Sequence, residues 1–349
     1  MKHLIPFVAL TLLSLLFASC KKEPDPIPDS TTEARPQNPR YLAAADGKVY
    51  VTCYSPTSVV RIDTGSREIE AVCRLGDYQP EGIAVAGGKL FVASSWIYGE
   101  NGNPIYDNKV YVIDIHTFRV EGTLAVGLNP GRLTAIDSNH VIVCCSGNYE
   151  DIAGNSYIID ASTHEVTPTG IDMTGLDVYE GFIYAYSAPY TAPHTRFLKL
   201  NPSTLADTTL LEGCGVGRPY GLNVIDGDLY VTTASASAKG DVYRFSPSGE
   251  QRWRSEAGMY TSKVAALGDG TAYVLNEGLW GGNDASLSRV TLASGQIDNS
   301  AFSAANARDL GDLAQDLLVY GTKAYVTVTF SNTLEVVSLN DNKSVQIHF

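Results

Sequence analysis

Basic residues and histidines are scarce in this sequence. Its 349 residues include 25 Lys and Arg against 38 Asp and Glu, which gives a formal net charge of −13. A nucleic-acid partner requires a basic surface that contacts the phosphates, so this composition argues against nucleic-acid binding. The six histidines are scattered along the chain and form no cluster in the sequence.

The chain also lacks the short motifs of common active sites. It contains no G-x-S-x-G, no H-E-x-x-H and no glycine-rich phosphate loop between a strand and a helix. The acidic residues Glu81, Glu277, Asp312 and Asp316 are expected near the mouth of the central channel of the ring-shaped fold predicted below. Their spacing matches no cation ligand set. We therefore predict no catalytic residue, no metal site and no cofactor. The alternative to a protein without catalytic activity is a metal-dependent hydrolase or lactonase that acts in the channel.

Cysteine is infrequent after residue 20. The later cysteines form no C-x-x-C pair, and no histidine spacing completes a zinc site. Because they are odd in number, they cannot all pair with one another, and we expect small buried strand residues. These cysteines are Cys53, Cys73, Cys144, Cys145 and Cys214.

The longest apolar run lies at the N-terminus. "MKH" precedes "LIPFVALTLLSLLF", which is short for a membrane span and has the flanks of a signal peptide. The stretch "LFASC" resembles a bacterial lipobox, so we expect residues 1–19 to be removed and Cys20 to carry the lipid anchor. The alternative is an ordinary cleaved signal peptide. Residues 20–37 are rich in proline and charge and predict an extended tether, which leaves the lipid as the only membrane contact.

From residue 38 onward the sequence repeats. Seven copies, with a period of roughly 40–50 residues, each contain a short apolar segment, a glycine-rich turn such as "DGK" or "GGK", and "VYV" or a similar triplet. Alternating residues predict short strands, and long helical periodicity is absent. We predict an all-β fold, a seven-bladed β-propeller of four-stranded antiparallel blades over residues 38–349, whose last blade is complete. A pair of β-sandwiches would not explain seven equivalent copies.

The repeats resemble the YVTN type. Residues 275–319, "LNEGLWGGNDASLSRVTLASGQIDNSAFSAANARDLGDLAQDLLV", are similar to a block near the N-terminus of the BtuG family of cobalamin-capturing surface lipoproteins from Bacteroidetes. Here the block lies near the C-terminus, so relative to that family the chain is arranged as a circular permutation by about two blades.

This resemblance implies a function and a location. It implies a non-enzymatic lipoprotein of the outer membrane, at the cell surface, that binds a cobalamin-like corrinoid or docks on an outer-membrane transporter of the TonB-dependent type. A different small molecule, a glycan or a protein would also suit such a surface.

Loops of two kinds point to the binding face. In a propeller, the connections between strands 1 and 2 and between strands 3 and 4 of each blade lie on one face. The connections between strands 2 and 3, and those between blades, lie on the other face. Here the first set is short and polar. The other set includes "SWIYGENGNPIYDN" (95–108), expected as the longest loop, and is rich in Trp, Tyr and Arg, which supply large contact areas. The alternative is that these rings only cover the core. The predicted ligand-binding residues are Arg40, Tyr41, Trp96, Tyr98, Tyr106, Arg132, Tyr149, Tyr190, Arg218, Tyr220, Tyr260 and Trp280.

Overall fold

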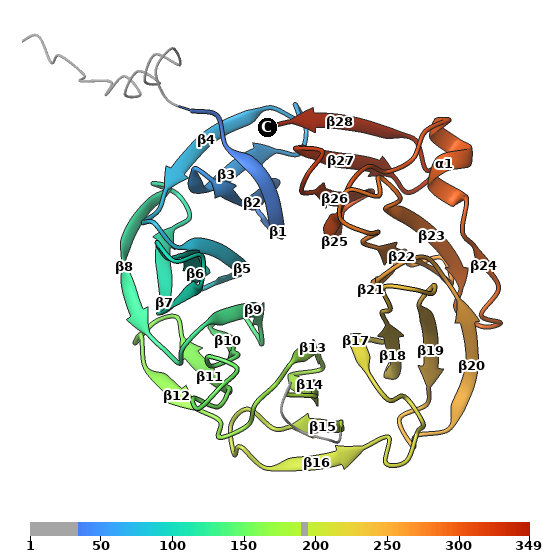
Figure 1. Ribbon diagram of the computed structural model, residues 1–349, viewed down its shortest axis with the longest axis horizontal. Coiled ribbons are helices and arrows are strands. Elements are labelled where there is room, and N and C mark those ends of the chain that lie inside the picture. Colours follow the sequence, from blue (N-terminus) through green and yellow to red (C-terminus); the bar gives the residue numbers. More distant parts are fainter. Residues whose placement is uncertain (1–33, 190–194) are drawn as a thin grey trace, which may run out of the picture. The chain divides into compact units, whose positions relative to one another are not determined.

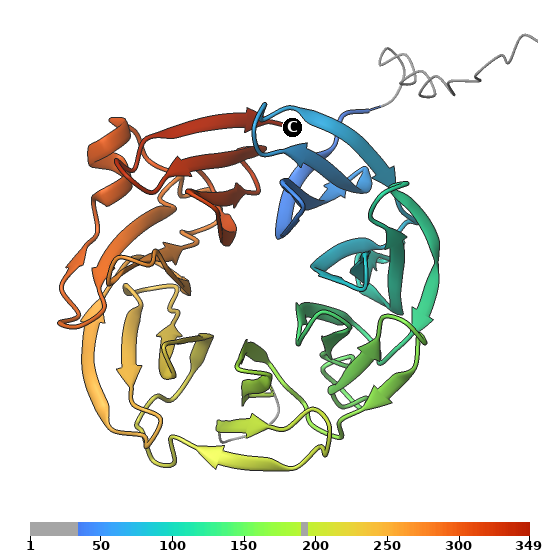
Figure 2. The same ribbon diagram turned by 180° about the vertical axis from the view of Figure 1, so that it is seen from behind.

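The computed structural model describes residues 34–189 and 195–349, and these form a ring of seven four-stranded antiparallel sheets (Figure 1). The predicted seven-bladed propeller is confirmed. In each blade the strands are hydrogen-bonded in chain order, with the first strand nearest the axis and the fourth at the perimeter. Figure 2 shows the same arrangement from behind.

The blades are numbered here in chain order, and each contributes four consecutive strands. Blades 1 to 4 comprise β1 (Gln37–Ala45), β2 (Lys48–Ser55), β3 (Thr57–Asp63), β4 (Ile69–Arg74), β5 (Gln79–Ala86), β6 (Lys89–Tyr98), β7 (Pro104–Asp114), β8 (Arg119–Ala125), β9 (Pro130–Ala135), β10 (His140–Cys145), β11 (Asn155–Asp160), β12 (Val166–Pro168), β13 (Gly175–Tyr179), β14 (Phe182–Ser187), β15 (Arg196–Leu200) and β16 (Asp207–Leu210). Blades 5 to 7 comprise β17 (Pro219–Ile225), β18 (Asp228–Thr233), β19 (Asp241–Phe245), β20 (Gln251–Glu256), β21 (Thr261–Ala266), β22 (Thr271–Asn276), β23 (Ser286–Thr291), β24 (Ile297–Asp298), β25 (Ala314–Tyr320), β26 (Lys323–Val328), β27 (Thr333–Ser338) and β28 (Ser344–His348).

One short helix, α1 (Ala301–Asn306), lies in the connection between blades 6 and 7 and is not predicted by the sequence pattern. Its six residues are too few to produce a helical period in the sequence. No helix in the described part of the chain is long and apolar enough to cross a membrane.

The core is divided among the interfaces between neighbouring blades. Seven clusters of buried apolar residues each combine residues of two adjacent blades. The second strand of every blade contributes one large buried residue that faces the next blade, which explains why the "VYV" triplet recurs. These residues are Tyr50, Phe91, Ile142, Tyr184, Tyr230, Tyr273 and Tyr325.

The ring closes between blades 7 and 1 without exchanging a strand. All four strands of blade 7 come from the C-terminal segment, as predicted, and Tyr325, Leu334 and Val336 pack with Leu42 of blade 1 in one cluster. Hydrogen bonds reinforce this packing, because Thr329 Oγ1 donates to the carbonyl of Pro39 at 2.8 Å. The closing interface is therefore built like the other six.

The expected long loop at 95–108 is wrong. β6 continues to Tyr98 and β7 begins at Pro104, so only residues 99–103 form the turn. Trp96 pairs with Tyr106 and Tyr98 with Pro104 along an extended antiparallel ladder. Aromatic and β-branched residues on both arms favour strands, and "GENGN" supplies the turn.

Four of the five cysteines between residues 34 and 349 are buried, and all five are free in the described structure. The prediction of small buried strand residues is confirmed for Cys53, Cys73, Cys144 and Cys145, which lie in β2, β4 and β10. Cys214 is partly exposed in the connection between blades 4 and 5.

We expect Leu334→Ala at the closing interface to lower the free energy of unfolding by about 2–5 kcal/mol, because the truncation leaves a cavity in a fully buried cluster. Urea denaturation would measure this loss. Leu90→Ala, at the interface between blades 1 and 2, should cost a similar amount, whereas Val345→Ala at an exposed site of β28 should cost little. A Leu334→Ala variant as stable as the parent would show that closure does not depend on this packing.

Candidate functional site

A β-bulge marks the start of the inner strand in six of the seven blades. A bulge bends its strand and redirects the side chains beside it. Since every inner strand starts on the same face of the ring, these bulges surround one mouth of the central channel. The register shifts fall at Pro39–Leu42, Pro80–Ile83, Pro130–Leu133, Pro219–Gly221, Thr261–Lys263 and Ala314–Asp316.

Proline stands at the bulge in four blades, because its missing N–H cannot join the ladder. The residues that follow Pro39, Pro80, Pro130 and Pro219 are polar, aromatic or glycine. At Gly82, a Cβ atom would lie 2.5 Å from the carbonyl oxygen of Gly131, so glycine allows the inner strands of blades 2 and 3 to approach closely. The repeat thus places functional groups around the axis and sets the spacing of the blades.

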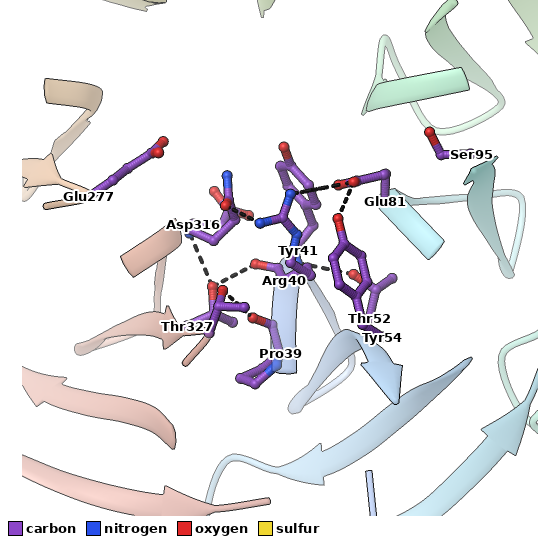
Figure 3. Close-up of polar contacts among 12 residues, drawn as sticks. Pro39, Arg40, Tyr41, Thr52, Tyr54, Glu81, Ser95, Glu277, Asp316 and Thr327 are labelled. Carbon is purple, nitrogen blue, oxygen red and sulfur yellow. Dashed lines mark hydrogen bonds and ion pairs between the residues drawn. The ribbon is translucent and has the colours of Figure 1, made fainter. Parts of the chain in front are cut away.

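Arg40 joins three blades at the channel mouth (Figure 3). Its guanidinium lies 3.1 Å from Glu81 Oε2 of blade 2 and also donates to the side-chain carbonyl of Gln315 in blade 7. Tyr54 donates its hydroxyl to the same carboxylate, and its ring lies 4.7 Å from the guanidinium carbon. Burial opposes the charge on Arg40, but Glu81 more than offsets this and raises the Arg40 pKa above its usual value. Protein groups therefore surround Arg40.

Side chains of the inner strands also bind the backbone of the next blade. Asp177 accepts a hydrogen bond from the N–H of Val224 at 2.8 Å, and Asn223 accepts one from the N–H of Val264 at 2.8 Å. Asp316 accepts from the N–H of Leu42 at 3.0 Å. These contacts link blades 4 to 5, 5 to 6, and 7 to 1.

Lys263 supplies the contact between blades 6 and 7. Its ammonium group lies 2.7 Å from Asp316 Oδ1, and the second oxygen of this carboxylate binds Leu42 in blade 1. One buried carboxylate therefore connects three consecutive blades through a cation and a backbone amide.

Glu277 extends toward the axis from the end of β22 (Figure 3). Tyr220 donates its hydroxyl to Glu277 Oε2 at 2.9 Å, and the Tyr186 hydroxyl donates to the carbonyl of Tyr220 at 2.8 Å. Burial raises the pKa of Glu277 to about 7, although Tyr220 and the nearby cation of Arg132 both favour its ionised form. Glu277 can therefore change its protonation near neutral pH.

A pocket of about 960 Å³ lies beside the axis on the same face. The connections between the second and third strands are longest in blades 3 to 6, at 146–154, 188–195, 234–240 and 277–285. Described residues of the first three connections line the pocket, and in the second of them these are Ala188 and Pro189. Among its residues, Tyr149 is 52% exposed and Ile152 is 49% exposed. Arg218, Tyr220 and Tyr260 also line the pocket, and the rings of Tyr220 and Tyr260 lie 5.8 Å apart in an edge-to-face contact.

The structure does not bring all predicted ligand-binding residues together. Tyr149, Arg218, Tyr220 and Tyr260 line the pocket. Arg40, Tyr41 and Arg132 lie on the inner strands around the axis. Trp96, Tyr98 and Tyr106 belong to the β6–β7 hairpin, where the ring of Tyr106 lies 6.1 Å from that of Tyr149 in an edge-to-face contact. Trp280 stacks on Phe330 in another part of the face, and Tyr190 lies outside the described residues.

Other residues of the two sites were not predicted as ligand-binding. Ile152 and Asp172 line the pocket, and Tyr54 and Lys263 lie at the axis. Glu81, Glu277 and Asp316, which are expected near the channel mouth, each have a polar partner there. Asp312 instead accepts a hydrogen bond from the N–H of Gly281. Within the described ranges, no group of three or more His, Cys, Asp or Glu is arranged to hold a metal ion.

Comparison with known proteins bears on the fold. No protein-family model matches the chain, and no curated protein sequence matches it. Hydrazine synthase from Kuenenia stuttgartiensis, an enzyme, is similar over 90% of this chain and 99% of its own, with a TM-score of 0.62 and 14% identity. The computationally designed protein Ika8 is similar over 90% of this chain and 88% of its own, with a TM-score of 0.59 and 10% identity. At these identities the similarity shows the fold alone.

We expect Arg40→Gln to lower the free energy of unfolding by about 3–5 kcal/mol, because it leaves the Glu81 carboxylate buried without its cation. Chemical denaturation at pH 7 would measure the change. Arg254→Gln, which breaks an exposed pair with Asp241, should change the free energy of unfolding far less, because solvent screens that pair. Equal, small losses in both variants would contradict the structural role assigned to Arg40.

Proposed function

We propose that this protein is a non-enzymatic, lipid-anchored binding protein that captures a ligand in the pocket lined by blades 3 to 5 and by Tyr260. The observation that carries the proposal is the convergence of long connections on one pocket of about 960 Å³. Ligand sites commonly measure about 300–1,000 Å³ and combine apolar walls with a few oriented polar groups. Tyr149, Tyr260 and Arg218 supply such walls and such a group.

The charged groups at the axis are paired with one another, which favours a structural role for them over a catalytic one. Arg40 and Glu81 neutralise each other, and so do Lys263 and Asp316. Their positions link neighbouring blades, which assigns them a part in the rigidity of the ring. A rigid support lowers the entropy that a pocket loses when it binds a ligand.

The proposed ligand is a cobalamin-like corrinoid, and this choice follows from the resemblance of residues 275–319 to the BtuG family. A large ring-shaped molecule with polar substituents suits a pocket with aromatic rings and an arginine. By the same resemblance we propose a location on the outer membrane, at the cell surface, beside a TonB-dependent type of transporter. Another small molecule or a glycan would use the same surface.

We expect Arg218→Ala and Tyr149→Ala to weaken ligand binding about thirtyfold or more, the effect of losing about 2 kcal/mol at a binding hot spot. Calorimetric titration of the purified protein with cobalamin, followed by a glycan screen, would measure it. Both side chains are exposed, so the melting temperature should change little.

Arg119→Ala is the matched control, because Arg119 begins β8 after a short turn on the opposite face and is also exposed. It should bind like the parent protein. If Arg119→Ala weakens binding and the pocket variants do not, the binding face has been assigned to the wrong side. A large fall in melting temperature on Tyr149→Ala would instead identify that ring as a cover of the core.

The lipid anchor can be tested independently of the pocket. Cys20 lies outside the described residues. Cys20→Ala should leave the protein soluble or unprocessed, because the acylated thiol would be missing. Membrane fractionation with a salt wash would detect this, with Cys214→Ala as the control. Persistent membrane association of Cys20→Ala would refute the anchor.

A further inference from the structure

Arg132 differs from the other cations at the channel mouth. Arg40 has Glu81 at 3.1 Å and Lys263 has Asp316 at 2.7 Å. Arg132 lies partly buried at the bulge of β9, and its guanidinium forms no hydrogen bond or ion pair with any residue that the structure describes. Its charge is compensated by an electrostatic interaction with Glu277 and not by a direct ion pair.

Three tyrosines and one carboxylate surround Arg132. Arg132 interacts electrostatically with Tyr41, Tyr186, Tyr220 and Glu277. The hydroxyls of Tyr186 and Tyr220 are donated to other acceptors, whereas within the described ranges the Tyr41 hydroxyl has no hydrogen-bond partner. Arg132 and Tyr41 both line an axial cavity of about 310 Å³. A guanidinium and a hydroxyl are therefore free to donate into the same space.

The acidic residues of this cavity are already occupied. Asp316 is paired with Lys263 and with the N–H of Leu42, and Asp177 accepts the N–H of Val224. These carboxylates are therefore engaged in holding neighbouring blades together. Among the described residues, the Arg132 guanidinium and the Tyr41 hydroxyl have no acceptor of their own.

We propose that Arg132 and the Tyr41 hydroxyl form a subsite for a single oxyanion, a phosphate or carboxylate group. Guanidinium groups bind both kinds of oxyanion through paired N–H donors. The subsite is separate from the pocket, and it stands whether or not the pocket binds a ligand. Tyr220 connects the two, because it lines the pocket and donates its hydroxyl to Glu277.

Glu277 would make anion binding depend on pH. Its pKa of about 7 means that it loses its charge as the pH falls toward 6, which removes a repulsion from the bound anion. By linkage, binding an anion would raise this pKa further, so the affinity falls as the pH rises through 7. The titratable and charged groups that face Glu277 are Arg40, Tyr41, Arg132, Tyr186 and Tyr220.

The test titrates the purified full chain with sulfate and, separately, with acetate at constant ionic strength. Sulfate stands in for phosphate because its charge does not change between pH 6 and pH 8, and acetate represents a carboxylate. The parent should bind at least one of them saturably. Arg132→Gln should weaken that binding about tenfold or more, and Tyr41→Phe should weaken it several-fold.

Control variants separate this subsite from its surroundings. Arg119→Gln on the opposite face should bind the anion like the parent. The parent's affinity should fall about tenfold from pH 6 to pH 8, and Glu277→Gln should remove most of that difference. Binding of sulfate alone identifies a phosphate-type subsite, and binding of acetate alone a carboxylate-type one.

Two results would overturn the proposal: the absence of saturable binding of either anion, or anion binding by Arg132→Gln that equals that of the parent. Because the pocket is tested with Arg218→Ala and Tyr149→Ala, failure at one site is distinguishable from failure at the other. Tyr41→Phe removes a single oxygen, so it keeps the proposal testable even if Arg132→Gln proves unstable.

Discussion

The propeller depends on contacts by which an inner-strand side chain of one blade binds the next blade. Asp177, Asn223 and Asp316 each accept a backbone N–H from the following blade. A sheet that packs face to face on its neighbour through apolar residues alone could slide. These directional hydrogen bonds fix the height of one inner strand against the next, and so fix where the bulges and their side chains lie around the axis.

The contacts between blades differ from one part of the channel mouth to another. Between blades 7, 1 and 2, the contacts are made by charged side chains, and Arg40 with Glu81 is their centre. In blade 4, β13 has no bulge, begins with Gly175 and leaves room for the ring of Tyr186. The long connections also belong to blades 3 to 6. One part of the ring is thus filled by paired charges, and the other is left open for a pocket.

The sequence predicted the repeating parts of this structure better than the contacts between them. Seven copies of one strand pattern led directly to the ring, because each copy has the same local chemistry. The β6–β7 hairpin was missed because polar "GENGN" and glycine resemble a loop, while Trp96 and Tyr106 pair only across the turn. The Arg40–Glu81 pair joins residues 41 positions apart in different blades, and no local pattern indicates which charges will meet.

Tyr220 belongs both to the pocket and to the group of side chains at the axis. Its backbone follows the bulge proline of blade 5, its ring faces the pocket and contacts Tyr260, and its hydroxyl binds Glu277. A shift of this ring would change the shape of the pocket and would also remove a hydrogen bond that favours the charged form of Glu277. The pocket and the axial groups therefore share one side chain, which provides a physical route by which occupancy of one could alter the protonation of the other.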